Sequence, residues 1–355
     1  MPDGRPSAPG ARVDLNRSIR QSRQLAARQI IDVMTGTWLA QSIYAAVCLG
    51  LPDLVRAGCR DARSLAERAG ADTDAVSRLM RLLLAFDVFG SSEAGYQLRP
   101  ISESLCEGAE GSMRDLCLLY GGEFHRAWGN ADVAFRTGQP GFDAAFGRSL
   151  HDYLADTPQA RERFSRAMNA GSVVFADVAA GFDFAHSATL TDVAGGDGTL
   201  LATILRAHRH LHGTLYERAQ LIDPARQQLA AAIRAGRAMT VAGDMFESVP
   251  GGADVYILCR VLQDWDDAQC AILLRNCRQA MTANSARLLV VDRVIDPERS
   301  SKLPVFWDLH LLMVAGGRER TLAEYAGLLG EADLYVDRVG HLSLETSLLV
   351  ARPGR

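Results

Sequence analysis

The segment 191–265 holds glycines and a carboxylate whose spacing suits the binding of a nucleoside. A predicted strand, TLTDV, runs into a turn that contains Gly195, Gly196 and Gly198, and a predicted helix follows. Glycines at such a turn let a ligand approach the backbone closely and let the helix start tightly against the strand. Glu217 follows Gly198 by 19 residues, at the end of a second apolar strand. A carboxylate in that position can accept hydrogen bonds from both hydroxyls of a ribose.

A third predicted strand, AMTVAGD, ends at Asp244, and Met245 and Phe246 follow it. The carboxylate of Asp244 could accept a hydrogen bond from an adenine amino group while the two neighbouring side chains flank the ring. The glycine turn does not read GxGxxG, and no Arg or Lys that could bind a phosphate lies next to it. These features favour an adenosyl ligand without phosphates over NAD. The structural alternative is a tight turn with two ordinary surface carboxylates.

From residue 190 onward, short apolar runs alternate with amphipathic helical segments. This alternation predicts an α/β domain over residues 181–355, with a doubly wound, Rossmann-like parallel sheet. Ligands of such sheets bind at the carboxyl ends of the strands, which is where the motifs above lie. Residues 121–180 are predicted to form a helical linker region, and most of its aromatic side chains are expected to pack in the core.

The first 120 residues are predicted to contain two further regions. Residues 1–20 are rich in Gly, Pro, Arg and Ser, which is typical of a disordered tail. Residues 21–120 read as helices, with Asp72 or Thr73 capping one of them, followed by a short hairpin in VFGSSEAGYQLRP. This is a winged-helix pattern, but its second helix carries only Arg78 and Arg81, whereas a DNA-binding face needs several cations. We therefore expect this region to pack against a partner chain.

The composition excludes several classes of protein. The chain has 355 residues, 48% of them hydrophobic, and a net charge of −4, so its charge gives no reason to expect nucleic acid as a partner. No apolar stretch reaches membrane-spanning length, and the first residues lack the apolar core of a signal peptide. The seven cysteines are odd in number and include no CxxC pair, which favours reduced thiols in a cytoplasmic protein over disulfides or a metal site.

The motifs DVAGGDG, GDMFE, VLQDWDD and GGRERT occur in this order between residues 192 and 321. In combination they resemble the plant-type small-molecule O-methyltransferases, and especially the bacterial natural-product branch of that family, from about Ile31 to the C-terminus. The resemblance implies a winged-helix-like domain that interlocks two subunits as a homodimer, followed by a domain that binds S-adenosyl-L-methionine. The residues that it and the motifs place at this cofactor are Gly195, Gly196, Gly198, Glu217, Asp244, Met245, Phe246, Cys259 and Trp265.

The position that the family uses for its catalytic base departs from the pattern. The family has a His there, before Asp-Trp, which removes the proton of the substrate hydroxyl, but this chain has Gln263. A neutral imidazole can take a proton near neutral pH, whereas an amide only donates or accepts hydrogen bonds. The Lys that usually lies four residues earlier is replaced by Cys259. An ordinary copy of the family mechanism is therefore in doubt.

Three other residues could take part in the chemistry. Asp292 and Glu319 match the two acidic residues that orient the His in this family. Glu319 could itself accept a proton, or it could pair with Arg318 or Arg320. His310 is either a hydrogen-bonded helix residue or a relocated base that also anchors the substrate.

The resemblance also places an aromatic acceptor in a pocket. The residues expected to line it are Trp128, Phe164, Met168, Asp308, His310 and Leu311. We expect O-methylation of a phenolic hydroxyl on a secondary metabolite, largely by proximity and orientation. C-methylation, or a hydroxylase, decarboxylase or pericyclase-like reaction that also requires S-adenosylmethionine, remains an alternative. A non-catalytic scaffold is disfavoured by the intact glycine turn, Glu217 and Asp244.

Overall fold

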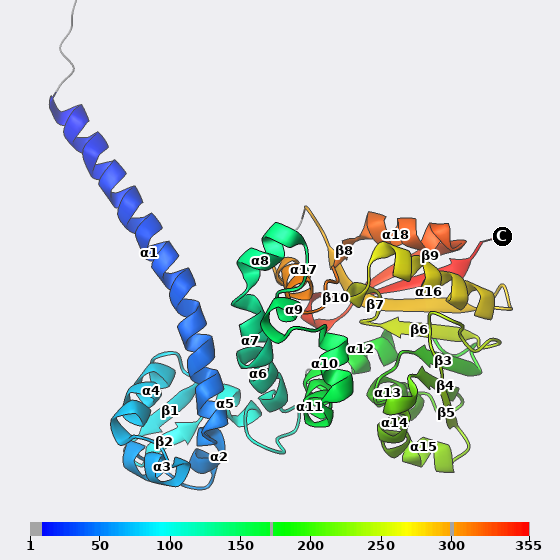
Figure 1. Cartoon of the computed structure of the whole chain (residues 1–355), viewed down its shortest axis with the longest axis horizontal. Coiled ribbons are helices and arrows are strands. Elements are labelled where there is room, and N and C mark those ends of the chain that lie inside the picture. Colours follow the sequence, from blue (N-terminus) through cyan, green and yellow to red (C-terminus); the bar gives the residue numbers. More distant parts are fainter. Residues whose placement is uncertain (1–8, 171–172, 299–301, 355) are drawn as a thin grey trace, which may run out of the picture. The chain divides into compact units, whose positions relative to one another are not determined.

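Figure 1 shows the computed structural model of the chain, which describes residues 9–170, 173–298 and 302–354. The chain divides into two compact units, residues 1–121 and 122–355. Residues 122–180, which the sequence set apart as a linker region, thus belong to the same unit as the predicted sheet. No helix in the described ranges is long and apolar enough to cross a membrane.

The first unit contains helices and a two-stranded antiparallel hairpin around one hydrophobic core. Its elements are α1 (Pro9–Cys48), α2 (Leu51–Arg56), α3 (Ala62–Ala69), α4 (Thr73–Ala85), β1 (Phe89–Ser92), β2 (Gly95–Leu98), α5 (Pro100–Ser104) and α6 (Arg114–Gly121). The carboxylates of Asp61 and Asp72 accept hydrogen bonds from backbone N–H groups and so cap α3 and α4. The predicted helix pair and hairpin are confirmed.

The long helix α1 corrects one expectation from the sequence. A disordered tail was predicted over residues 1–20, but α1 begins at Pro9, and of these twenty residues only 1–8 lie outside the described part of the chain. Residues 11–20 contain neither Gly nor Pro and include Ala, Leu and three Arg, which favour helix. Pro9 itself stands at the first helical position, where proline is tolerated.

Large apolar side chains lie exposed along α1. Ile30, Met34 and Trp38 follow one another at intervals of four residues, and their exposed fractions are 65%, 64% and 69%. Residues four apart share one face of a helix, so these side chains form a continuous apolar stripe. A stripe of this kind is typical of a surface that contacts another protein.

The second unit is built on a sheet with the strand order β5-β4-β3-β6-β7-β10-β9, to which β8 is added beside β7. The strands are β3 (Thr189–Val193), β4 (His212–Glu217), β5 (Ala238–Ala242), β6 (Val255–Cys259), β7 (Arg287–Ile295), β8 (Arg320–Thr321), β9 (Leu334–His341) and β10 (Thr346–Pro353). The first five strands of this order are parallel, and β10 runs antiparallel to both of its neighbours. The predicted doubly wound α/β fold is confirmed, with an antiparallel edge.

Helices cover both faces of this sheet, as Figure 1 shows. On one face lie α12 (Val173–Gly181), α13 (Thr199–Ala207), α14 (Ile222–Gln228) and α15 (Ala230–Arg234), and on the other α16 (Asp267–Ala280) and α18 (Leu322–Glu331). Strand β6 contributes side chains to the hydrophobic cores on both faces of the sheet. Val255 and Ile257 lie in one cluster, and Tyr256 and Leu258 lie in the other. Successive side chains of a strand point to opposite faces, so a strand buried on both sides is apolar throughout.

The remaining helices of this unit lie around the carboxyl ends of the strands or connect to them. They are α7 (Glu123–Trp128), α8 (Ala131–Thr137), α9 (Gly141–Phe146), α10 (Leu150–Asp156), α11 (Pro158–Asn169) and α17 (Leu303–Val314), with short 3₁₀ turns η1 (Ala219–Leu221), η2 (Leu262–Asp264) and η3 (Ser343–Glu345). Helix α17 packs against α7 and α9. The turn η2 follows β6 directly and carries Gln263.

Candidate active site

The glycine turn after β3 leaves space for a ligand beside its backbone. Gly196 and Gly198 have φ angles of 60° and 82°, in the left-handed region that favours glycine. A Cβ added at Gly195 would lie 2.5 Å from Asp192 Oδ2 and from Leu215 Cδ1, so no larger residue fits there. A Cβ at Gly196 would meet no atom within 4 Å, and this glycine therefore faces open space.

The carboxylate of Glu217, at the end of β4, is held against this turn. Glu217 Oε2 accepts a hydrogen bond from Gly196 N at 3.0 Å, and Oε1 accepts one from Arg218 N at 2.7 Å. Burial raises the pKa of Glu217, although both backbone hydrogen bonds act in the opposite direction. Each oxygen retains a lone pair, so the carboxylate can still accept hydrogen bonds from a ligand.

A second carboxylate, Asp192, lies beneath the glycine turn. Asp192 is 1% exposed, and neither carboxylate oxygen has a hydrogen-bond partner within the described residues. Burial, and then the neighbouring charges of Glu217 and Asp197, raise the pKa of Asp192 to about 8. The side chain of Asn169, at the end of α11, donates a hydrogen bond to Asp197 Oδ2 at 2.6 Å. The turn is therefore bounded by three carboxyl groups.

Aromatic rings and Asp244 lie close to the end of β5. Asp244 Oδ1 accepts a hydrogen bond from Phe246 N at 2.8 Å, which fixes the turn that carries Met245. The Phe246 ring meets the Trp265 ring edge to face, with centroids 4.8 Å apart, and His151 stacks on Trp265 at 5.1 Å. Aromatic side chains such as Phe246 and Trp265 can pack against a purine.

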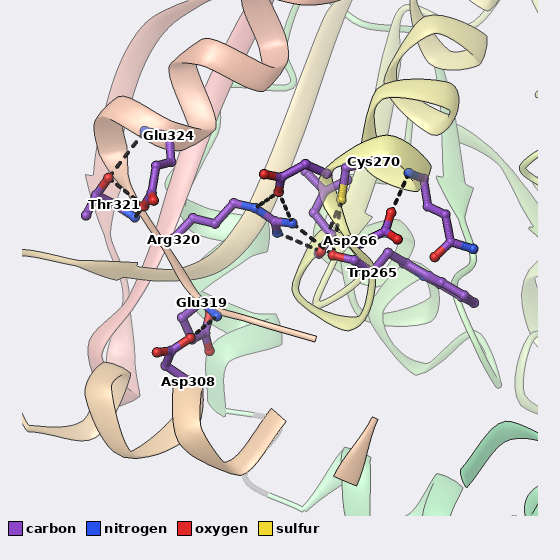
Figure 2. Close-up of polar contacts among 11 residues, drawn as sticks. Trp265, Asp266, Cys270, Asp308, Glu319, Arg320, Thr321 and Glu324 are labelled. Atoms are coloured by element: carbon purple, nitrogen blue, oxygen red, sulfur yellow. Dashed lines mark hydrogen bonds and ion pairs between the residues drawn. The ribbon is translucent and has the colours of Figure 1, made fainter. Parts of the chain in front are cut away.

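Arg320, in the GGRERT motif, holds the turn that carries Gln263. Its guanidinium donates to Leu262 O (2.9 Å), Trp265 O (2.8 Å) and Asp267 Oδ1 (2.8 and 3.0 Å), as Figure 2 shows for Trp265. Arg320 is 1% exposed, and its hydrogen bond to Leu262 O is buried, whereas the Asp267 side chain that it pairs with is 59% exposed. The backbone of Gln263 and Asp264 is thus clamped on both sides, and Arg318 N donates to Gln263 O at 2.8 Å.

Three carboxyl groups gather beside this turn. Asp292 lies on β7, Glu319 precedes β8, and Asp264 ends η2. Burial, and then repulsion by Asp292, raises the pKa of Glu319 to about 9; burial raises the pKa of Asp264 to about 7 and that of Asp292 well above its ordinary value. Neighbouring carboxylates cannot all stay ionised in a dry site, so the cluster carries less than its full negative charge at neutral pH.

Of the two alternatives for Glu319, the structure does not show the pairing with Arg318 or Arg320 among the described residues. Arg320 is engaged with Asp267, and the nearest cation to Glu319 is Arg293, whose Nη1 lies 3.9 Å from Glu319 Oε1. Arg293 is itself buried and lies over the Trp307 ring, with the guanidinium carbon 4.3 Å from the ring centroid. The attraction of Arg293 lowers the pKa of Glu319 less than burial raises it.

His310, on α17, is hydrogen-bonded and buried. Trp128 Nε1 donates to His310 Nδ1 at 3.2 Å, and the Phe124 ring meets the imidazole edge to face at 5.0 Å. Because Nδ1 accepts this hydrogen bond, the proton of the neutral ring is on Nε2. Burial, and then Arg293, lower the pKa of His310 to about 4. The imidazole is therefore a weak proton acceptor at neutral pH and is suited to donating a hydrogen bond.

The other predicted acceptor residues lie on two helices. Phe164 and Met168 are half-buried on α11, and Arg260 Nη2 donates to Met168 O at 2.7 Å. Asp308 and Leu311 lie on α17, and Asp308 Oδ1 accepts a hydrogen bond from Glu319 N at 3.0 Å (Figure 2). These two hydrogen bonds connect α17 to Glu319, and α11 to Arg260, which follows Cys259 in the chain. Burial raises the pKa of the Cys259 thiol to about 12, so this side chain is neutral.

Comparison with known proteins identifies the family of this chain. The model of the O-methyltransferase domain matches residues 128–334, and that of the O-methyltransferase dimerisation domain matches residues 31–108. The chain belongs to the O-methyltransferase family. It is 40% identical over 334 residues to phenazine-1-carboxylate N-methyltransferase of Pseudomonas aeruginosa, with 94% of this chain and 99% of the relative covered.

Two solved structures extend the likeness to the fold and the cofactor. The structure of mitomycin 7-O-methyltransferase is 36% identical, with a TM-score of 0.87, and the match covers 94% of this chain and 100% of that one. An O-methyltransferase from neocarzinostatin biosynthesis, in complex with S-adenosylmethionine and 2-hydroxy-5-methyl naphthoic acid, is 29% identical with a TM-score of 0.77 over 88% and 95% of the chains. This protein is an S-adenosylmethionine-dependent methyltransferase, and these relatives give no support to the non-methylating alternative.

The residues around the glycine turn fit this cofactor. The open space at Gly196, the two-oxygen acceptor Glu217 and the orphaned oxygens of Asp192 match an adenosyl group with hydroxyl and ammonium donors. Sequence reasoning had missed Asp192, although an acidic residue inside an apolar strand two positions before the turn is a readable signal. It had also missed His151 and Arg293, and no local pattern in the sequence distinguishes either from a surface residue.

Proposed function

We propose that this enzyme transfers a methyl group to a phenolic hydroxyl of an aromatic secondary metabolite. The relatives named above act on, or are bound to, phenazine, mitomycin and naphthoic acid compounds, which are natural products. The observation that carries the mechanistic part of the proposal is Gln263, a buried amide held by Arg320 where the family has its base. The hydroxyl must therefore react by orientation, with its proton passing to another group.

In this proposal the cofactor lies across the carboxyl ends of β3, β4 and β5. Gly195, Gly196 and Gly198 let it approach the backbone, and Glu217 accepts the ribose hydroxyls. Asp244, Met245, Phe246 and Trp265 contact the adenine, and Cys259 lies beside the methionine part as a neutral thiol. S-adenosylmethionine, when bound, supplies an electrophilic methyl group on a positively charged sulfur.

Orientation of the acceptor is assigned to α11, α7 and α17. Trp128, Phe164, Met168 and Leu311 would hold the aromatic ring by apolar contact, and His310 would donate a hydrogen bond rather than act as a base. Good orientation can contribute about 7–11 kcal/mol to the lowering of a barrier. General base catalysis contributes only about 10²- to 10⁴-fold. Correct placement can thus sustain turnover when the imidazole is missing.

We assign the proton of the hydroxyl to Glu319, with Asp292 as its neighbour. A phenolic hydroxyl has a pKa of about 10, and the pKa of Glu319, about 9, is close to that value. Matched values favour proton transfer from the hydroxyl to the ionised form of Glu319. Gln263 can align the hydroxyl oxygen through its amide, because an amide both donates and accepts hydrogen bonds.

The dimerisation model and the apolar stripe of α1 together support a homodimer formed through the first unit. Light scattering of the purified chain should give twice the monomer mass. Replacing Trp38, which is 69% exposed, with Glu should shift the protein toward monomer. A wild-type monomer at micromolar concentration would contradict this part of the proposal.

Incubation with S-adenosylmethionine labelled in its methyl group tests the function. Mass spectrometry of a panel of phenols and naphthols should detect one labelled methyl group on an oxygen. A chain that binds S-adenosylhomocysteine but labels no aromatic acceptor would contradict the proposed function. Label on a ring carbon would instead support the C-methylation alternative.

A further inference from the structure

The acceptor side of the site contains buried oxygen atoms that no described residue satisfies. Both carboxylate oxygens of Asp292, both of Glu319 and the Oε1 atom of Gln263 are buried without a hydrogen-bond partner. These residues are 0%, 3% and 7% exposed. The backbone beside them is tightly packed, since a Cβ added at Gly317 would overlap Gln263 O. The backbone that carries Gln263 therefore has little room to move.

Neither protonation state of the two carboxyl groups satisfies this cluster by itself. Ionised carboxylates would repel each other in a low dielectric, and protonation supplies only one donor for each carboxyl group, which is fewer than the accepting oxygens of the set. Leaving such groups unsatisfied costs about 1–3 kcal/mol each. A native protein rarely keeps several of them together unless a ligand or water completes the hydrogen bonds. The amide oxygen of Gln263 needs a donor whatever the protonation state of the carboxyl groups, because it can only accept hydrogen bonds.

The shared requirement of these oxygens is a hydrogen-bond donor with positive charge. Arg293 Nη1 lies 3.9 Å from Glu319 Oε1, which is beyond hydrogen-bond length, so this ion pair does not satisfy that oxygen. No group of His, Cys, Asp and Glu within the described ranges is arranged to hold a metal ion. An anionic substituent would meet three carboxyl groups and would be disfavoured. A protonated amino group has three donors and no acceptor, which matches the set.

We propose that the aromatic acceptor carries a basic amino group next to the methylated hydroxyl, and that Gln263, Asp292 and Glu319 receive it. This inference rests on the proposed function and names the class of its substrate. The positive charge of the amino group stabilises the ionised form of Glu319 and Asp292. Glu319, which burial keeps protonated at neutral pH, is thereby made able to accept the proton of the hydroxyl. The amino group of the acceptor thus converts Glu319 into a proton acceptor, the role that a His has in the family.

A pair of probes that differ only in the nitrogen tests this inference. 1-Aminomethyl-2-naphthol and 1-ethyl-2-naphthol have nearly the same shape, and only the first carries an ammonium group. Calorimetry on the full chain saturated with S-adenosylhomocysteine should show the amine binding about 10- to 100-fold more tightly, the effect of a charge-assisted hydrogen bond. Binding of the amine should also release protons, which titrations in buffers of different ionisation enthalpy measure.

Isosteric variants identify the residues that receive the amine. Asp292→Asn and Glu319→Gln keep the side-chain volume and remove the charge, so each should reduce the preference for the amine by about tenfold. Asp333→Asn, at an exposed carboxylate paired with Arg278, serves as the matched control and should leave the preference unchanged. Thermal unfolding of each variant verifies that it is folded.

The possible outcomes distinguish a failure of this inference from a failure of the proposed function, methyl transfer to a phenolic hydroxyl. Equal affinity and equal turnover of the two naphthols would overturn the inference and leave the methyltransferase assignment intact. An unchanged preference in both Asp292→Asn and Glu319→Gln would also overturn it. Failure of the chain to bind or methylate either naphthol, while it binds S-adenosylhomocysteine, would overturn the proposed function and this inference together.

Discussion

The two halves of the site satisfy their polar groups in different ways. On the cofactor side, each oxygen of Glu217 accepts a backbone N–H group, one of them from the glycine turn. On the acceptor side, Gln263, Asp292 and Glu319 keep buried oxygens without partners. The first half thus combines Glu217, which the backbone holds in place, with Asp192, whose buried oxygens also have no partner among the described residues. The second half has no carboxylate held in the way that Glu217 is, so the backbone preorganises the recognition of the ribose but not that of the acceptor.

The largest effect on stability is expected at Arg320, which holds the turn between the cofactor side and the acceptor side. Arg320→Met removes the four hydrogen bonds of a buried guanidinium and leaves Leu262 O and Trp265 O to find other donors. We expect the free energy of unfolding to fall by about 3–5 kcal/mol in chemical denaturation, because one partner of a buried charged network is lost. Arg278→Met, at a surface ion pair, is the control and should cost at most about 1 kcal/mol. Equal losses would show that Arg320 does not hold the turn.

The cofactor half is tested at Glu217. Glu217→Ala should weaken S-adenosylmethionine binding about 100-fold in calorimetry, since two charge-assisted hydrogen bonds to the ribose are lost together. Asp223→Ala changes an exposed carboxylate on α14 and should leave the affinity within about twofold. Unchanged affinity in Glu217→Ala would remove the assignment of the ribose site and with it the contrast between the halves.

The acceptor half makes a prediction about stability and pH. The pKa of Glu319 is raised by folding to about 9, so its contribution to stability is present below its ordinary value and is lost as the pH rises toward 9. Glu319→Gln should therefore stabilise the fold increasingly between pH 5 and pH 9, by several kcal/mol at the upper end, since each unit of the pKa shift is worth about 1.4 kcal/mol. Denaturation curves at four pH values measure this difference. A constant difference across that range would contradict the burial of an ionisable group there.

The smallest effect is expected at Gln263. If the amide only aligns the hydroxyl oxygen, Gln263→Ala should lower kcat about three- to tenfold, the loss of one neutral hydrogen bond. KM for the cofactor should stay unchanged, because Gln263 lies on the acceptor side. Complete loss of turnover in a folded variant would show that the amide has a larger role than alignment.

The sequence was sufficient for the half that depends on the backbone. The turn after β3 and Glu217 are recognisable because glycine, strand end and carboxylate recur at fixed spacing in a doubly wound sheet. Asp192 was also readable, as a carboxylate inside an apolar strand. The parallel, doubly wound sheet followed from the alternation of strands and helices, although the antiparallel β10 did not.

The acceptor half was beyond prediction in most of its detail. The hydrogen bond between Trp128 and His310 joins residues 182 positions apart, and no local pattern encodes it. The placement of Glu319 beside Arg293 instead of Arg320 depends on how β7 and β8 meet. The start of α1 at Pro9 was missed because the composition of the first ten residues outweighed the helix formers that follow.

A crystal structure of the chain with S-adenosylhomocysteine tests the central claim most directly. The account predicts both ribose hydroxyls within hydrogen-bond distance of Glu217 and the adenine between Asp244 and the Phe246 and Trp265 rings. It also predicts that the Gln263, Asp292 and Glu319 oxygens remain unoccupied by the nucleoside. A nucleoside bound elsewhere, or one whose ribose is held without Glu217, would contradict the account.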